Sequence, residues 1–404
     1  MLKIVEITDK NEWDGFININ GGHPLQLWGW GELKSNHNWQ VKRIFVKNVS
    51  KEAPKHKKQQ YSDVQAAAQI LTRKLPWPLN SFAYSPRGPL ILSEKAEERA
   101  KLLDKIAKYS KNHLHPRPVG LSIEPDWEDF PLVATEKGKW RRAKNTILIP
   151  QTLIIDLKQS DDEILAHMSK KTRQYIRKSA DSVSVRELET AQELEQCLDI
   201  YEDTAKRAGF AIHDRQYYRD LTKLLGKNAP IFAAFAKIPN EVEAIDDENA
   251  VIDDQNSTEN NLDNTNQTEK EVTVATEQIS ENQKIIKQVF GDKINYQEEM
   301  IAFLWPIVSD KTSFELYGGV NELGQRKRSN YILKWLTIKQ LQSRGVERYD
   351  LNGLLNDGIS NFKRGFAKHE DLLAGTYDYP FSFKYALWSK FLPLGKKVIH
   401  KIKR

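Results

Sequence analysis

Apolar and polar residues follow two different periods along this chain of 404 residues. Four segments repeat apolar residues every three or four positions, which is the period of an amphipathic helix. Shorter runs rich in β-branched and aromatic residues lie between them and are typical of strands. This alternation predicts an α/β (α+β) fold. The predicted helices are 94–112, 160–180, 191–208 and 329–343, and the predicted strands are 40–46, 153–157, 183–188, 314–317 and 348–351.

Local signals mark the ends of two of these helices. Ser160 and Glu163 have the spacing of a capping box at the start of helix 160–180. Gly345 follows helix 329–343, where a C-terminal glycine is expected. Both halves of the chain contain a similar mixture of helices and strands, which favours two related α/β lobes.

The apolar pattern stops in a long polar segment, the acidic insertion 238–297. Asn, Asp, Glu, Gln and Thr dominate it, and such a composition buries too little apolar surface to offset chain entropy. We therefore expect this insertion to be disordered. The apolar runs 230–237 and 300–308 flank it, and we expect them to pair as neighbouring strands. A smaller polar insertion is expected at 47–62.

The formal net charge of +6 hides an uneven distribution. Residues 240–299 contain 16 Asp or Glu against 4 Lys, so this window carries −12 and leaves +18 for the rest of the chain. A body that basic attracts a polyanion such as tRNA, a nucleotide sugar or an anionic membrane. A solubilising surface is the competing interpretation.

Several classes of protein are excluded or disfavoured by what the sequence lacks. Cys197 is the only cysteine, so an intramolecular disulfide and a cysteine-based zinc site are impossible. No segment approaches the roughly 20 apolar residues that cross a bilayer, and the N-terminus lacks a signal core. We therefore expect a cytoplasmic protein. The absence of a nucleophile elbow, a P-loop and an H-E-x-x-H helix disfavours serine hydrolases, NTPases and zinc hydrolases.

A basic face is expected on helix 160–180. Lys170, Arg173 and Arg177 lie three and four residues apart and share one side of a helix. One interpretation is a surface that binds the phosphate backbone of a nucleic acid. The other is a solvated face whose charge complements the helix dipole.

Two further segments combine aromatic and basic residues. In 361–366, Lys363 and Arg364 lie between Phe362 and Phe366. One interpretation is that this segment presents a lysine that stabilises a phosphate or a developing oxyanion. The other is a surface loop anchored by its two aromatic rings. In 26–34, a tryptophan and a lysine lie four residues apart on one helical face, which suits phosphate binding or ordinary packing equally well.

The ordered set of segments resembles the Fem family (FemA/FemB-like) of peptidoglycan bridge-forming aminoacyltransferases, and the match covers nearly the whole chain except the two insertions. The order and spacing of many segments carry this resemblance. They are QLWGWGELK (26–34), YSPRGPLI (84–91), LSIEPDW (121–127), TLIIDL (152–157), HMSKKTRQYIRKSA (167–180), YEDTAKRAGFAIHDRQYY (201–218), LYGGVNELGQRKRSNYILKWLTIKQLQSRGVERYDLNG (316–353) and NFKRGFAKHE (361–370).

The resemblance implies a fold of two tandem acetyltransferase-like (GNAT-type) lobes. They are expected at 1–151 and 152–375, with the acidic insertion inside the second lobe and the C-terminal basic segment 376–404 packed on the first lobe. The implied reaction moves an aminoacyl group from aminoacyl-tRNA to an amine on the peptide stem of lipid II or UDP-MurNAc-pentapeptide. It implies no metal and no cofactor, with aminoacyl-tRNA as the co-substrate.

The resemblance also implies roles for individual residues. Two positions depart from the family pattern: His213 stands where some members have arginine, and Glu124 stands at an acidic position once considered for catalysis. The implied catalytic residues are Lys363 and Phe362; the precursor-binding residues are Lys34, Trp30, His213, Tyr217 and Glu124; the tRNA- or phosphate-binding residues are Lys170, Arg173, Arg177 and Arg364.

The tail from residue 381 contains seven Lys or Arg and no acid among many bulky apolar residues. A peripheral contact with the inner membrane leaflet is one interpretation, and a docked terminal helix with a frayed basic end is the other. Two further functions remain open: a related GNAT-type N-acyltransferase that uses acyl-CoA or acylates another amine, and a non-enzymatic protein that binds tRNA or membrane.

Overall fold

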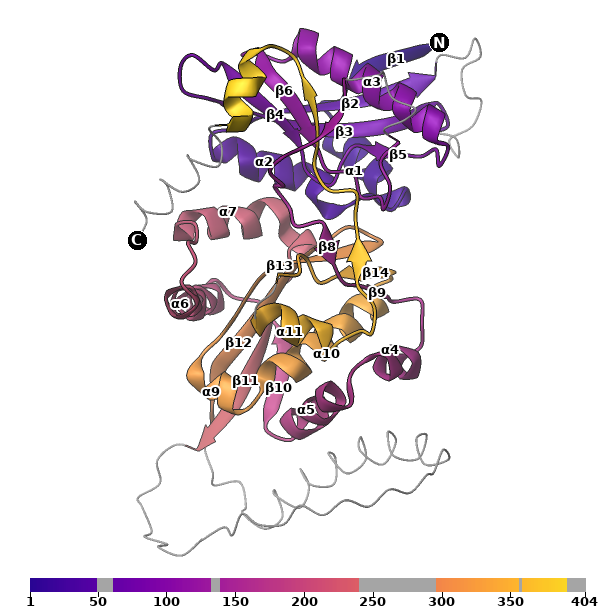
Figure 1. Ribbon diagram of the computed structural model, residues 1–404. Coiled ribbons are helices and arrows are strands. Elements are labelled where there is room, and N and C mark those ends of the chain that lie inside the picture. Colours follow the sequence, from indigo (N-terminus) through magenta and orange to yellow (C-terminus); the bar gives the residue numbers. More distant parts are fainter. Residues whose placement is uncertain (49–60, 132–138, 240–295, 356–357, 391–404) are drawn as a thin grey trace, which may run out of the picture.

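The computed structural model describes residues 1–48, 61–131, 139–239, 296–355 and 358–390. Two lobes, each built on its own β-sheet, are stacked along the long axis of the molecule (Figure 1). The α/β (α+β) class expected from the sequence is confirmed. The acidic insertion 238–297 lies almost entirely outside the described residues, as does most of the smaller insertion 47–62.

The first lobe contains an eight-stranded sheet with the order β1-β2-β3-β4-β6-β16-β7, and β5 pairs with β3 beside this path. Its strands are β1 Leu2–Glu6, β2 Gln40–Asn48, β3 Val64–Lys74, β4 Ser81–Ser85, β5 Leu90–Ile91, β6 Pro118–Ile123, β7 Arg141–Arg142 and β16 Tyr377–Pro380. Its helices are α1 Lys10–Ile19, η1 Pro24–Gln26, α2 Trp28–Asn36 and α3 Ala96–His113.

Helices cover both faces of the first-lobe sheet. On one face Leu103 and Ile106 of α3 pack in a buried cluster with Ile44 and Ile70 of the sheet. On the other face α1 packs its apolar side against Phe45 and its strand neighbours. The face that carries α1 and α2 is the one turned toward the second lobe (Figure 1).

The second lobe contains a six-stranded sheet with the order β10-β11-β12-β13-β14-β9, and β15 pairs with β8 in a small separate sheet. Its strands are β8 Gln151–Thr152, β9 Ile154–Asp156, β10 Val183–Glu187, β11 Phe232–Pro239, β12 Tyr296–Val308, β13 Thr312–Val320, β14 Arg348–Asp350 and β15 Asp371–Leu372. Its helices are α4 Asp161–His167, α5 Lys170–Ala180, α6 Ala191–Ala208, α7 Arg215–Leu225, η3 Gly226–Asn228, α9 Glu322–Arg326, α10 Ser329–Ser343 and α11 Gly358–Arg364.

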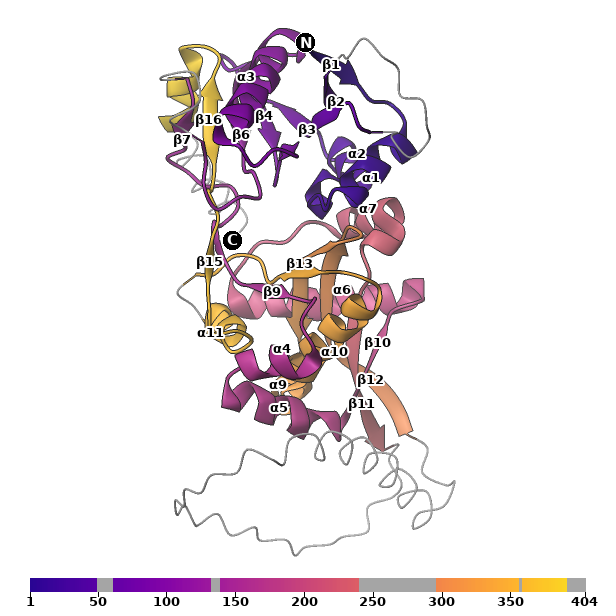
Figure 2. The same ribbon diagram turned by 90° about the vertical axis from the view of Figure 1, so that its right-hand side faces the viewer.

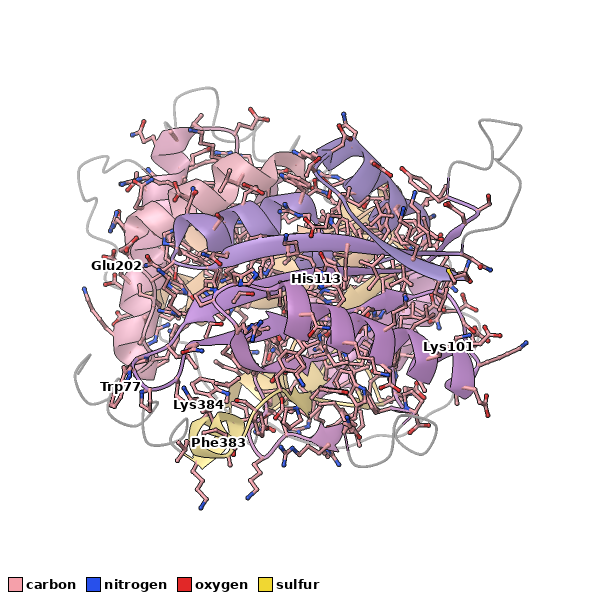
Figure 3. The ribbon with its side chains drawn as sticks, turned by 90° about the horizontal axis from the view of Figure 1, so that it is seen from above. Trp77, Lys101, His113, Glu202, Phe383 and Lys384 are labelled. Carbon is pink, nitrogen blue, oxygen red and sulfur yellow. The ribbon has the colours of Figure 1, made fainter. Side chains whose placement is uncertain are left out.

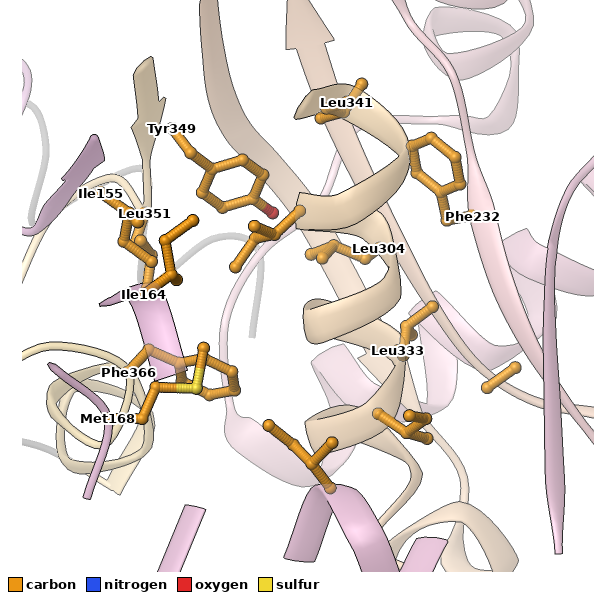
Figure 4. Packing of buried hydrophobic residues seen from close by; sticks show 14 of the residues in the cluster. Ile155, Ile164, Met168, Phe232, Leu304, Leu333, Leu341, Tyr349, Leu351 and Phe366 are labelled. Carbon is orange, nitrogen blue, oxygen red and sulfur yellow. The ribbon is translucent and has the colours of Figure 1, made fainter. Parts of the chain in front are cut away.

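Two buried clusters fill the two sides of the second-lobe sheet. One contains Leu333 and Leu341 of α10 together with Phe232, Tyr349 and Phe366 (Figure 4). The other joins α6 and α7 to the opposite side of β12 and β13, and it also includes residues of α2 from the first lobe. The apolar core is therefore continuous across the boundary between the lobes.

The structure confirms most of the predicted elements and corrects one. Helices 191–208 and 329–343 are α6 and α10, helix 94–112 is α3 shifted by one or two residues, and runs 230–237 and 300–308 pair as β11 and β12. The prediction of one helix over 160–180 is wrong, because it consists of α4 and α5. The Ser169 side chain accepts a hydrogen bond from the Thr172 N–H and caps a new helix there.

The chain returns to the first lobe near its C-terminal end. β16 runs antiparallel to β6 and lies between β6 and β7 (Figure 2). Residues 391–404, which include most of the basic tail, lie outside the described part of the chain. Among the helices that the structure describes, none has both the length and the apolar composition needed to cross a lipid bilayer.

Candidate functional site

Helices α2 and α7 meet at the boundary between the lobes. Gly29 makes this approach possible, because a Cβ at this position would lie 2.5 Å from the main-chain oxygen of Leu224. Any larger residue would push the two helices apart. Segment 26–34, for which the sequence suggested either phosphate binding or ordinary packing, thus forms part of the contact between the lobes.

Four of the five predicted precursor-binding residues come together at this contact. Lys34 Nζ donates a hydrogen bond of 2.8 Å to the Tyr217 hydroxyl and lies 4.3 Å from the centre of the Trp30 ring. The His213 ring stacks on the Tyr217 ring with centroids 3.9 Å apart. We call Trp30, Lys34, His213 and Tyr217 the Lys34 cluster.

Electrostatics sets Lys34 apart from an ordinary surface lysine. Burial lowers the pKa of Lys34 to about 8, and the charge of Arg73 acts in the same direction. Burial raises the pKa of Tyr217 to about 12, so this phenol stays protonated at neutral pH. Among the described residues no carboxylate pairs with Lys34. An ammonium held in this way is suited to an anionic ligand such as a phosphate.

The second lobe contains a cavity of about 650 Å³ between α6, β12, β13, α10 and α11. Its wall combines aromatic rings, including Tyr201 and Tyr317, with a few charged groups. We call it the second-lobe cavity. Burial, and then the neighbouring Tyr217, raise the pKa of Tyr317 well above its usual value, so the Lys34 cluster lies beside the wall of this cavity.

Both predicted catalytic residues line this cavity. Lys363 Nζ donates to the main-chain oxygens of Asn352, at 2.5 Å, and Gly353, at 3.1 Å. These bonds hold α11 against the loop after β14. Phe362 packs with its ring 4.9 Å from Tyr331 and 5.2 Å from Phe366. The segment is therefore an ordered part of the cavity wall.

Sequence reasoning missed a buried ion pair in the same wall. Lys334 of α10 and Glu315 of β13 form a salt bridge, and the Tyr349 hydroxyl donates to the same carboxylate at 2.8 Å. Lys334 is 3% exposed. Its position gave a signal, because it falls at core spacing among Leu333, Ile338 and Leu341 of an otherwise apolar helix face.

Glu124 is not placed as a ligand for substrate. It is 1% exposed, and its carboxylate accepts hydrogen bonds from Tyr84, Thr376 and the main-chain N–H groups of Ile147 and Leu148. These donors satisfy the buried carboxylate without a ligand. Glu124 therefore ties β6 to the segment between the lobes and to the residue before β16.

The predicted phosphate-binding residues do not form one surface. Lys170 and Arg177 are exposed on α5. The Arg173 guanidinium instead donates to the main-chain oxygens of Leu165, at 3.1 Å, and Met168, at 2.6 Å, so it closes the end of α4. Arg364 pairs with Glu370 at 2.5 Å. The basic face predicted from helical spacing therefore does not include Arg173, which has a structural role.

A family model described as the FemAB family matches residues 132–391, which is more than half of the chain. The lipid II:glycine glycyltransferase of Staphylococcus aureus (strain MRSA252) is 22% identical over 408 residues, and the alignment covers 94% of this chain and 93% of that protein.

Two solved structures show the likeness in fold. The crystal structure of FemX superposes with a TM-score of 0.68 at 19% identity, covering 94% of this chain and 97% of that one. A conserved protein of unknown function from Bacteroides thetaiotaomicron VPI-5482 superposes with a TM-score of 0.50 at 9% identity, covering 94% and 99%. The arrangement of the two lobes is thus that of FemX.

Proposed function

The chain belongs to the FemAB family, and from this premise we propose that it moves an aminoacyl group from aminoacyl-tRNA to an amine on the peptide stem of a peptidoglycan precursor. The resemblance inferred from the ordered sequence segments is confirmed by the family match. The chain is an enzyme of the kind that transfers amino acid groups in peptidoglycan bridge synthesis. The donor, the acceptor and the roles of individual residues are our proposals.

The Lys34 cluster is the observation that carries the acceptor side of this proposal. Lipid II and UDP-MurNAc-pentapeptide both carry phosphates that need a fixed cation. Lys34 offers one that is partly desolvated, oriented by Tyr217 and uncompensated by any described carboxylate. Charge-assisted hydrogen bonds of this kind are about twice as strong as neutral ones. We assign Trp30, His213 and Tyr217 to the same acceptor site.

The second-lobe cavity is our site for the donor. An aminoacyl ester is already activated, so attack by an amine needs positioning and stabilisation of the oxyanion more than a covalent nucleophile. In the step, the new C–N bond forms, the ester C–O bond breaks, and the 3′ oxygen of the tRNA leaves and takes up the proton that the amine loses. Lys363 is our oxyanion-stabilising group. Aminoacyl-tRNA is the co-substrate, and we propose no further cofactor.

The first lobe carries an exposed apolar patch that favours the lipid-linked acceptor. Trp77 is 93% exposed and Phe383 is 82% exposed. Figure 3 places both on the same side of the lobe, and Lys384 Nζ donates to the Pro78 oxygen at 2.9 Å, which joins the two segments. Exposed aromatic rings beside a lysine suit the interface of an anionic membrane. We propose that this patch rests on the inner leaflet, where lipid II is available.

Vesicle binding tests the membrane contact. Trp77→Ser combined with Phe383→Ser should lower binding to vesicles of anionic phospholipid several-fold. It should also slow transfer to lipid II in vesicles and leave transfer to UDP-MurNAc-pentapeptide unchanged. Leu372→Ser, which alters an exposed apolar residue of the second lobe, is the control. Equal binding by the patch variant and the control would remove the patch from membrane contact.

A transfer assay tests the function itself. A total tRNA pool charged with radiolabelled amino acids is incubated with the purified chain and either lipid II or UDP-MurNAc-pentapeptide. We expect label on at least one acceptor and loss of that labelling after ribonuclease treatment. The labelled amino acid and the preferred acceptor are read from the same experiment. No labelling of either acceptor by folded protein contradicts the proposal, and labelling from acyl-CoA would replace it by the acyl-CoA alternative.

A further inference from the structure

Glu315 is the only carboxylate among the described residues that line the second-lobe cavity. The other charged groups of the wall are Arg207, Lys334 and Lys363. A cavity with a surplus of cations suits a phosphate or an oxyanion. The Glu315 carboxylate therefore has one of two roles. It either only neutralises Lys334, or it also binds a positively charged part of the ligand.

The hydrogen bonds of Glu315 favour the second role. Lys334 Nζ and the Tyr349 hydroxyl both donate to Oε1 of this carboxylate. No described residue donates to Oε2, although the side chain lies in the cavity wall. Two donors on one oxygen fix the plane of the carboxylate and leave the other oxygen for a ligand.

The position of Glu315 relative to Lys363 narrows the identity of the ligand. The Asn352 side-chain amide donates to the Glu315 main-chain oxygen at 3.0 Å, and the Asn352 main-chain oxygen accepts from Lys363 Nζ. Asn352 thus links the strand that carries Glu315 to the ammonium of Lys363, our proposed oxyanion-stabilising group. In an aminoacyl ester, the α-ammonium and the reacting carbonyl are neighbouring groups. The cavity wall offers a carboxylate for the first and an ammonium for the oxyanion that develops on the second.

We propose that Glu315 Oε2 forms an ammonium-binding site that holds the α-ammonium of the aminoacyl group being transferred. This assignment rests on the proposed function and adds how the enzyme recognises its donor. An acyl-CoA carries phosphates but no ammonium on its acyl group, so the same site discriminates against it. Lys334 and Tyr349 are positioning residues that orient the carboxylate.

Binding of two small probes tests the site without requiring transfer. The first probe is 3′-amino-3′-deoxyadenosine acylated with glycine, which carries the α-ammonium. The second is its N-acetyl derivative, which lacks the charge. By calorimetry, the wild-type chain should bind the first probe roughly 10- to 100-fold more tightly, as expected for a hydrogen bond between charged groups. Glu315→Gln should bind both probes with equal affinity.

Two further variants control for folding and for surface charge. Glu315→Gln leaves Lys334 buried without its partner and is expected to unfold more readily. The double variant Glu315→Gln/Lys334→Met removes that uncompensated charge and should also bind both probes equally. Glu187→Gln removes a carboxylate that pairs with Arg344 on the surface of the same lobe. It should keep the full preference for the first probe.

The outcomes separate this proposal from the proposed function. Equal binding of the two probes by the wild-type chain, or an unchanged preference in both Glu315 variants, overturns the ammonium site. A rise in the KM for the peptide-stem acceptor, without a change in probe preference, assigns the ammonium to the acceptor amine and also overturns it. Absence of ribonuclease-sensitive labelling rejects the tRNA-dependent function, whereas the preference between the probes still decides the ammonium site.

Discussion

Two regions of this protein hold a lysine against aromatic rings in opposite electrical settings. In the Lys34 cluster the ammonium lies over Trp30 and donates to a neutral phenol, and no described carboxylate pairs with it. In the second-lobe cavity the Lys334 ammonium lies 5.4 Å from the Phe362 ring centre and forms a salt bridge with Glu315. Burial lowers the pKa of both lysines, but only for Lys334 does a carboxylate act in the opposite direction.

This difference shows how the same residue type serves two purposes. An uncompensated ammonium gains most from an anion that arrives with the substrate. A compensated ammonium is already satisfied and instead orients the carboxylate that it binds. We infer that the Lys34 cluster accounts for binding of the phosphate-bearing acceptor, whereas the cavity accounts for the donor and the chemical step. The following variants separate these roles.

Lys363→Ala should have the largest effect on turnover. Loss of a group that stabilises a developing oxyanion costs roughly 100-fold or more in kcat. The KM for the acceptor should change little, and thermal unfolding should shift far less than turnover. Lys368→Ala, which alters an exposed lysine of the same segment, is the matched control. Unchanged turnover of the Lys363 variant would remove this residue from the mechanism.

Lys34→Met should act mainly on acceptor binding. Removing a charge-assisted hydrogen bond to a phosphate should raise the KM for lipid II and for UDP-MurNAc-pentapeptide roughly 10- to 100-fold. The kcat at saturating acceptor should fall much less than in Lys363→Ala. Steady-state kinetics with each acceptor measures both quantities. A fall in kcat without a rise in KM would contradict our inference that the Lys34 cluster acts in acceptor binding.

Acceptor binding should weaken as the pH rises through about 8, the pKa of Lys34. Below that value Lys34 is charged and binds the phosphate, and above it the neutral amine does not. Bound phosphate itself favours the charged form, so the loss in the complex occurs at higher pH than in the free enzyme. KM measured from pH 6.5 to 9.5 in roughly half-unit steps should show this rise. Lys34→Arg should abolish it, because an arginine stays charged over that range.

Arg73→Gln should produce the smallest change. The Arg73 charge lowers the pKa of Lys34, so its removal should raise that pKa and move the loss of acceptor binding to higher pH. At pH 7 the KM should stay nearly the same, because Lys34 is already charged there. The same pH series measures the shift. A shift to lower pH would show that the electrostatic account of Lys34 has the wrong sign.

Local sequence patterns predicted local features well. The helices α6 and α10 begin and end where the pattern places them, and the i,i+4 pair of Trp30 and Lys34 meets on one face of α2. The pattern failed where two local signals competed. Apolar spacing runs through Ser169 without interruption, but the serine side chain caps α5 and divides the segment. Arg173 then finds main-chain oxygens at the end of α4, which helical spacing alone does not reveal.

The sequence by itself therefore determined the α/β class, most helices and the family, because these depend on residue spacing and on the order of segments along the chain. Only the tertiary structure decided which groups meet. Lys34 and Tyr217 are 183 residues apart, and Lys334 meets Glu315 across two elements of the second lobe. The chemistry of these lysines follows from burial and from the charges placed beside them, and both arise only when distant segments pack together.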